Sequence, residues 1–244
     1  MPAGRHEPPV RKSGGERKLG EILAQHIEDE IISGDWPVGT VVGSEAELMA
    51  RYGVSRAVFR EAMRLVDHHG VAAMRRGPRG GLMITEPDIE AGVRAVSLHL
   101  RFQKISPGQV AEARNALDLT CVRLAAERIT PAGAEQVRAS LDDEHKQVGR
   151  RGTRQHGSGQ LVFPDFHLLL ARLTGNPAMG VFVQMINRVL GEQEPRERTS
   201  KQKEQEAHRA HERIAEAVLA GDADTAVSRM SRHLDAVRDH LIGR

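Results

Sequence analysis

Three histidines in the C-terminal half of this 244-residue chain are spaced so that their imidazoles can meet. His211 and His233 each lie eleven residues from Asp222, on either side of a Gly-Asp turn between two stretches of helical periodicity. In an antiparallel helix pair, residues equidistant from the turn lie at the same height, so these two imidazoles should face each other. His167, on another predicted helix, can supply a third nitrogen. Imidazole suits zinc, nickel and similar ions, and three histidines with a water predict an open divalent-metal site.

The same histidines fit a second interpretation, in which they bond an organic acid or one another in a metal-free cavity. Two further histidines, His208 and His240, lie near the candidate ligands in sequence, and we expect both on the surface. Asp165 is only two residues from His167 and therefore belongs to a different face of a regular helix.

A second group of candidate residues is basic. The net charge of the whole chain is only +2, yet residues 51–79 contain seven arginines and only two acidic residues, Glu61 and Asp67. This local excess predicts a basic face that contacts nucleic acid phosphates. The arginines are Arg51, Arg56, Arg60, Arg64, Arg75, Arg76 and Arg79.

Short elements surround these arginines. Apolar spacing predicts helices over about 19–33, from Ser44 to Tyr52, and from Ser55 to about residue 69, with Gly53 forming the turn between the last two. Ser44 and Glu47 form a capping-box pattern, and Ser55 is a good N-cap. Residues 71–74 and 82–85 read as two strands that flank a Gly- and Arg-rich hairpin tip. This order is that of a winged helix-turn-helix.

In such a fold the helix that begins at Ser55 enters the major groove of DNA. We expect its first turns to read base edges, because arginine can bond guanine bidentately. Arg51 and the two tip arginines should contact phosphates or the minor groove. The predicted DNA-binding residues are Arg51, Ser55, Arg56, Ala57, Arg60, Arg76 and Arg79.

The rest of the chain reads as helix. Residues 86–88 form a linker, and the breaks occur at Pro-, Gly- or Asn-containing turns. A Gly-rich polar stretch over 149–159 predicts a loop. We expect helices near 89–103, 107–128, 131–149, 163–174, 177–194, 202–220 and 222–242.

Composition narrows the class of protein. Aromatic residues make up 3% of the chain, so the core must use aliphatic side chains, which suits packed helices. Cys121 is the only cysteine, which excludes an intrachain disulfide and fits a reducing cytoplasm. No apolar run approaches the ~18 residues of a membrane span. Residues 1–17 lack the apolar segment of a secretory signal and are expected to form a disordered tail.

The N-terminal segment resembles the DNA-binding head of the GntR family of bacterial regulators. The resemblance rests on five runs of residues and on the wing from Gly70 to Gly81. It departs at Ala46, where FadR-like members often carry a basic residue, so one expected DNA contact is missing. The matching runs are Ile31–Gly34, Pro37–Gly39, Ser44–Leu48, Tyr52–Arg56 and Val58–Ala62.

The remainder resembles the FadR-like (FCD) domain, an antiparallel helical bundle that binds an effector. The matching segments lie at Glu112–Arg114 and Asp118, at Asp165–His167 and residues 175–177, at residues 211–214 and 221–222, and at Met230 and His233. By this resemblance, Arg114 points into the effector cavity and pairs with a ligand carboxylate, and Asp118 is a second effector-binding residue. In metal-binding relatives an aspartate four residues before the first histidine completes the site, but here that position is Phe163.

Together these patterns predict a mostly α protein with an N-terminal winged helix-turn-helix at 18–86 and an all-α antiparallel helical bundle at 87–244. We expect a cytoplasmic, homodimeric transcriptional regulator that binds a palindromic operator in double-stranded DNA and responds to a small carboxylate metabolite, with repression as the commoner outcome. Arg114, Asp118, His167, His211 and His233 would bind the effector, and the three histidines a zinc or nickel ion. The alternative is a metal-dependent enzyme that uses the same three histidines, but its nucleophile and general base are not evident.

Overall fold

The structure, a computed structural model, describes residues 16–77, 80–148, 164–193 and 200–241. The chain divides into two compact units between Ala91 and Gly92. Each unit has its own hydrophobic core, one containing Phe59 and Leu82 and the other Phe166 and Ile214. Among the described residues, no helix is long and apolar enough to cross a membrane. The expected tail at 1–17 and the loop at 149–159 fall almost wholly outside the described residues.

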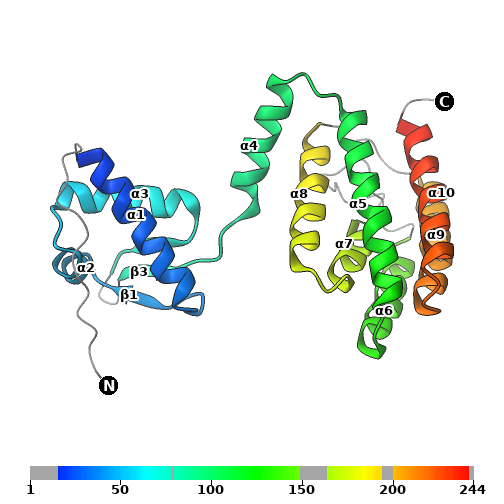
Figure 1. The fold of residues 1–244 in the computed structure, drawn as a ribbon, viewed down its shortest axis with the longest axis horizontal. Coiled ribbons are helices and arrows are strands. Elements are labelled where there is room, and N and C mark those ends of the chain that lie inside the picture. Colours follow the sequence, from blue (N-terminus) through cyan, green and yellow to red (C-terminus); the bar gives the residue numbers. More distant parts are fainter. Residues whose placement is uncertain (1–15, 78–79, 149–163, 194–199, 242–244) are drawn as a thin grey trace. The chain divides into compact units, whose positions relative to one another are not determined.

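The first unit has the winged helix-turn-helix order. It contains α1 (Glu16–Ser33), β1 (Val41–Gly43), α2 (Glu45–Tyr52), α3 (Arg56–His69), β2 (Ala72–Arg75) and β3 (Gly81–Ile84) (Figure 1). The three strands form an antiparallel sheet in the order β1-β3-β2. The hairpin of β2 and β3 was predicted, whereas β1 was not. The apolar stripe of α3 packs on α1 and closes the core.

Local signals position α3. The capping box predicted before α2 is present, since Ser44 Oγ accepts from the Glu47 amide and Glu47 accepts from the Ser44 amide at 2.8 Å. Gly53 ends α2 in the left-handed region at φ 63°, which costs a glycine little and lets the chain turn sharply. Ser55 then caps α3 through the Val58 amide. The tight turn therefore fixes the direction in which α3 leaves α2.

The second unit is helical throughout its described part. Its elements are α4 (Ile89–Phe102, which begins in the first unit), α5 (Pro107–Glu127), α6 (Pro131–Gln147), α7 (Pro164–Leu173), α8 (Pro177–Gln193), α9 (Lys201–Leu219) and α10 (Ala223–Leu241). Four of these helices begin with proline, whose fixed φ and missing N–H suit the first helical position. Helix α5 packs against α7, α8, α9 and α10, so it lies at the centre of the bundle (Figure 1).

Candidate functional site

The turn between α9 and α10 brings two of the predicted histidines together. Gly221 adopts the left-handed region at φ 71°, and the two helices pack side by side. His211 and His233 therefore face each other as their equal spacing from Asp222 predicted, with their Nε2 atoms 3.3 Å apart. Both side chains are buried in the bundle.

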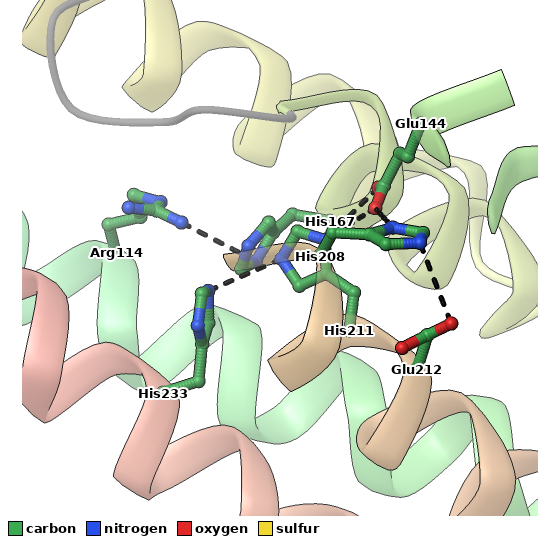
Figure 2. A network of polar contacts seen from close by, with 7 residues as sticks. All are labelled: Arg114, Glu144, His167, His208, His211, Glu212 and His233. Atoms are coloured by element: carbon green, nitrogen blue, oxygen red, sulfur yellow. Dashed lines mark hydrogen bonds and ion pairs between the residues drawn. The ribbon is translucent and has the colours of Figure 1, made fainter. Parts of the chain in front are cut away.

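His167 joins this pair from α7. Its ring centroid lies 5.2 Å from that of His211 and 5.5 Å from that of His233. The three histidines offer nitrogen atoms that all lie within 4.8 Å of one another, which is the spacing that ligands of one metal ion require. Figure 2 shows the three side chains converging from three helices. Phe166, next in the chain to His167, stacks on the His211 ring at 4.2 Å and restricts its plane.

An ion pair on α5 lies against the histidines. Arg114 Nη2 is 2.8 Å from Asp118 Oδ2, and that oxygen is also 3.1 Å from His167 Nδ1. The Arg114 Nη2 atom itself is 3.4 Å from the same His167 nitrogen. Arg114 is 1% exposed and Asp118 is 2% exposed, so the pair is enclosed by protein. The two residues are one helical turn apart, which places them on the same face of α5.

Glu144 on α6 is a member of the cluster that the sequence pattern did not predict. Its two carboxylate oxygens lie 3.0 and 3.1 Å from His211 Nδ1, and Oε2 lies 3.2 Å from His208 Nδ1 (Figure 2). His208 Nε2 in turn lies 3.5 Å from Glu212, which is half exposed. The expectation that His208 lies on the surface is therefore wrong, because Glu144 binds it inside the bundle. The side chain of His240 lies outside the described residues.

Burial and charge tune the protonation of this cluster. Burial, reinforced by His211 and His167, lowers the pKa of His233 to about 2. Burial, with His167 and His208, also lowers the pKa of His211 well below its ordinary value. Burial raises the pKa of Asp118, but the adjacent His167 and Arg114 outweigh it, so that this pKa lies below its ordinary value. At neutral pH, His211 and His233 therefore present uncharged imidazoles beside an ionised Asp118.

Several buried polar atoms, most of them in this cluster, lack a hydrogen-bond partner among the described residues. They are Arg114 Nε, both Asp118 oxygens, His167 Nε2 and Asn187 Oδ1. Asp118 Oδ2 is close enough to Arg114 and His167 for ion pairing, but its alignment does not meet hydrogen-bond geometry. Unpaired buried polar groups are costly, and each calls for a bound ion, water or ligand. The donor set therefore fits a divalent metal on the three imidazoles and an anion on Arg114.

The sequence analysis also singled out two positions just before His167, Phe163 and Asp165. Phe163 lies outside the described residues. Asp165 is exposed while His167 is buried, as expected for residues on different faces of α7.

The predicted DNA-reading residues form an exposed face on α3. Ser55, Arg56, Ala57 and Arg60 are all exposed, while the opposite stripe of the helix is buried in the head core. Arg56 approaches Glu45 only to 3.7 Å, and Arg60 forms no ion pair with any described residue. The Ser55 hydroxyl also caps α3.

The other predicted DNA-contacting residues, Arg51, Arg76 and Arg79, differ in their surroundings. Arg51 is paired with Glu30, which also accepts a hydrogen bond from the Tyr52 hydroxyl at 2.8 Å. A phosphate contact by Arg51 would therefore have to share this guanidinium. Arg76 is exposed in the hairpin tip, and Arg79 lies outside the described residues.

Comparison with known proteins matches both units. A family model described as "FCD domain" matches residues 109–236, and one described as "Bacterial regulatory proteins, gntR family" matches residues 19–80. The transcriptional repressor NanR of Cronobacter sakazakii is 24% identical over 233 residues, which cover 93% of this chain and 86% of NanR. The transcriptional regulator LutR of Bacillus subtilis is 28% identical over 219 residues, covering 87% of this chain and 96% of LutR. The solved structure of Streptococcus agalactiae GntR has the same fold, with a TM-score of 0.71 at 24% identity over 91% of this chain and 99% of that one.

Proposed function

Since this chain belongs to the GntR family of bacterial regulatory proteins and carries an FCD domain, we propose that it is a repressor released from DNA by a small carboxylate. DNA binding and transcriptional regulation are the function of this family and of this chain. The family consists of transcriptional regulators and not of enzymes, so the metal-dependent enzyme is set aside. Repression is favoured by the likeness to NanR, which is itself named a repressor.

One observation carries the effector proposal. Arg114 and three buried histidines meet in one cluster, and this cluster contains buried polar atoms that have no hydrogen-bond partner among the described residues. Arginine has five N–H donors, and the contacts to Asp118 and His167 use only one nitrogen, Nη2. A carboxylate effector can take the remaining donors, with Asp118 holding the guanidinium in place. A zinc or nickel ion held by His167, His211 and His233 would supply a second point of attachment for the same carboxylate.

An effector bound here can change DNA binding only if it prefers one arrangement of the helices over another. The site draws residues from α5, α7, α9 and α10, so a ligand that tightens it changes how these helices pack. The difference between its affinities for the two arrangements sets how far the DNA-binding equilibrium moves.

A homodimer completes the proposal. One recognition helix covers only a half-site, and two heads related by a two-fold axis would bind a palindrome. Exposed apolar side chains on the helical unit, including Phe102 on α4 and Phe182 on α8, are candidates for the interface. Sedimentation at micromolar concentration tests this, and a monomer both with and without DNA would contradict it.

Arg60→Ala should weaken binding to the specific DNA site by ~1–3 kcal/mol, which is about 5- to 150-fold, because Arg60 lies exposed in the early turns of α3. Gel shifts on the DNA upstream of the protein's own gene, with random DNA in parallel, measure the effect. Random DNA should be bound almost as well as by the wild type. An equal loss on both DNAs would make Arg60 a phosphate contact instead of a base reader.

Metal titration tests whether the three histidines of the proposed sensor bind an ion. Elemental analysis and zinc or nickel titration of the wild type should show one ion per chain, and His211→Ala should weaken binding by more than the roughly 10- to 100-fold that loss of an outer-shell partner costs. Phe163→Asp should strengthen binding, because it restores the carboxylate found in metal-binding relatives. His99→Ala, which removes an exposed histidine, is the matched control. If His211→Ala binds the metal as tightly as the wild type, the three histidines are not its ligands.

A further inference from the structure

Glu144 contacts one of the three candidate metal ligands, His211, and is not itself a member of the three-histidine group. It lies on α6, is 4% exposed, and directs both oxygens at Nδ1 of His211. The same carboxylate also receives Nδ1 of His208 at 3.2 Å. Figure 2 shows Glu144 and His233 on opposite sides of the His211 ring. The two ring nitrogens of His211 thus have different partners.

These contacts define which nitrogen of His211 carries hydrogen. A carboxylate only accepts hydrogen bonds, so Nδ1 of His211 must be the donor to Glu144. In a neutral imidazole the other nitrogen, Nε2, then holds a lone pair. This Nε2 atom lies 3.3 Å from Nε2 of His233, which must therefore donate in the metal-free protein. Glu144 in this way sets the direction of the bond between the two histidines.

His167 provides a contrast within the same cluster. Its Nδ1 lies 3.1 Å from an acceptor, Asp118 Oδ2, and 3.4 Å from a donor, Arg114 Nη2. These neighbours favour opposite tautomers, so contacts alone do not select one. Phe166 fixes the plane of the His211 ring by stacking, but a stacked ring can still carry its hydrogen on either nitrogen. The selection at His211 therefore depends on Glu144.

We propose that Glu144 is the positioning residue of this site, which holds His211 with Nε2 unprotonated and aimed at the metal position. The inference rests on the metal-bearing form of the proposed sensor and extends it to α6, a helix that carries none of the three histidines. Metal-ligating histidines generally donate their second N–H to a carboxylate or carbonyl, which orients the ring and raises its basicity. Glu144 makes that contact here with a buried carboxylate.

The first test needs no metal. Nitrogen-15 NMR of the metal-free wild type distinguishes protonated from unprotonated ring nitrogens, and His211→Ala identifies the signals of His211. We expect hydrogen on Nδ1 of His211 at neutral pH. Hydrogen on Nε2 of His211 would overturn the proposal.

The second test is zinc titration of Glu144→Gln beside Asp143→Asn. Glutamine keeps the shape of the side chain but loses its charge, and its amide no longer enforces one tautomer. Asp143 is the neighbouring carboxylate on α6 and pairs with the exposed Lys146, so it is a matched control. We expect Glu144→Gln to weaken zinc binding about 10- to 100-fold and to give mixed His211 tautomers, with Asp143→Asn unchanged in both.

Unchanged affinity and an unchanged tautomer in Glu144→Gln would overturn the proposal, and so would an equal loss in Asp143→Asn. If Glu144→Gln does not fold by circular dichroism, the wild-type tautomer decides alone. If the wild type binds neither zinc nor nickel, the metal part of the proposed function fails, and the role of Glu144 at the metal fails with it. The tautomer measurement then still shows whether Glu144 orients His211.

Discussion

Asp118→Ala is expected to lower the free energy of unfolding of the helical unit by about 3–5 kcal/mol. Asp118 is the only carboxylate that forms an ion pair with Arg114 among the described residues, at 2.8 Å, and both side chains are almost fully buried. Removing the carboxylate leaves the guanidinium enclosed, without a counter-charge and close to His167. A buried charge without its partner costs far more than an exposed pair gains.

Two optical signals separate the units in this experiment. Trp36 is the only tryptophan and packs at the edge of the head core, whereas most of the helical residues belong to the other unit. Denaturant unfolding followed by far-ultraviolet circular dichroism should show the loss. Unfolding followed by Trp36 fluorescence should move much less, because the two units have separate cores.

Two further variants show whether the loss comes from the unpaired charge. Arg114→Met combined with Asp118→Leu removes both charges and should recover most of the stability, since apolar replacements of a buried ion pair are often neutral or stabilising. Asp224→Ala breaks the exposed pair with Arg123 and should change little. A loss below about 1 kcal/mol for Asp118→Ala, or a double variant no more stable than the single one, would contradict the unpaired-charge explanation.

The helix pairing and the facing histidines followed from local signals in the sequence. A glycine turn between two amphipathic helices forces them antiparallel, so equal spacing from Asp222 was sufficient to place His211 opposite His233. The helices of the DNA-binding head could be predicted equally well, because Ser44, Gly53 and Ser55 mark where they begin and end. In these cases residues close in sequence determine the geometry.

Contacts between elements distant in sequence were not predictable in the same way. Glu144 meets His208 and His211 across more than sixty residues, and nothing in the periodicity of α6 distinguishes it from the exposed acids beside it. Arg51 pairs with Glu30 on α1 for the same reason. Strand β1 has only three residues, too few to show alternation. The pairing of Arg114 with Asp118 did leave a signal, since opposite charges four residues apart share a helix face.

Acid is expected to destabilise the helical unit from about pH 6.5 downward in metal-free protein. Burial lowers the pKa of His211 and His233 in the folded state, while the unfolded chain binds protons near the ordinary value of 6.5. Below pH 6.5 the unfolded state therefore holds more protons than the folded state, so stability falls as pH falls. Two such histidines should cost about 3 kcal/mol between pH 6.5 and pH 5. Asp118 does not contribute in this window, because its lowered pKa affects stability only below its ordinary value of 3.8.

His233→Gln separates this effect from general acid unfolding. Its amide can still donate to Nε2 of His211, but it does not titrate, so about half of the acid-dependent loss should disappear. His99→Gln removes an exposed histidine and should leave the pH dependence unchanged. Denaturant unfolding by circular dichroism between pH 7 and pH 5, with a chelator present, measures all three proteins, because a bound metal would compete with protons for the same nitrogens. Stability that stays constant over this range would mean that the two imidazoles are protonated in the folded bundle, and neutral ligands for a metal would then be absent at pH 5.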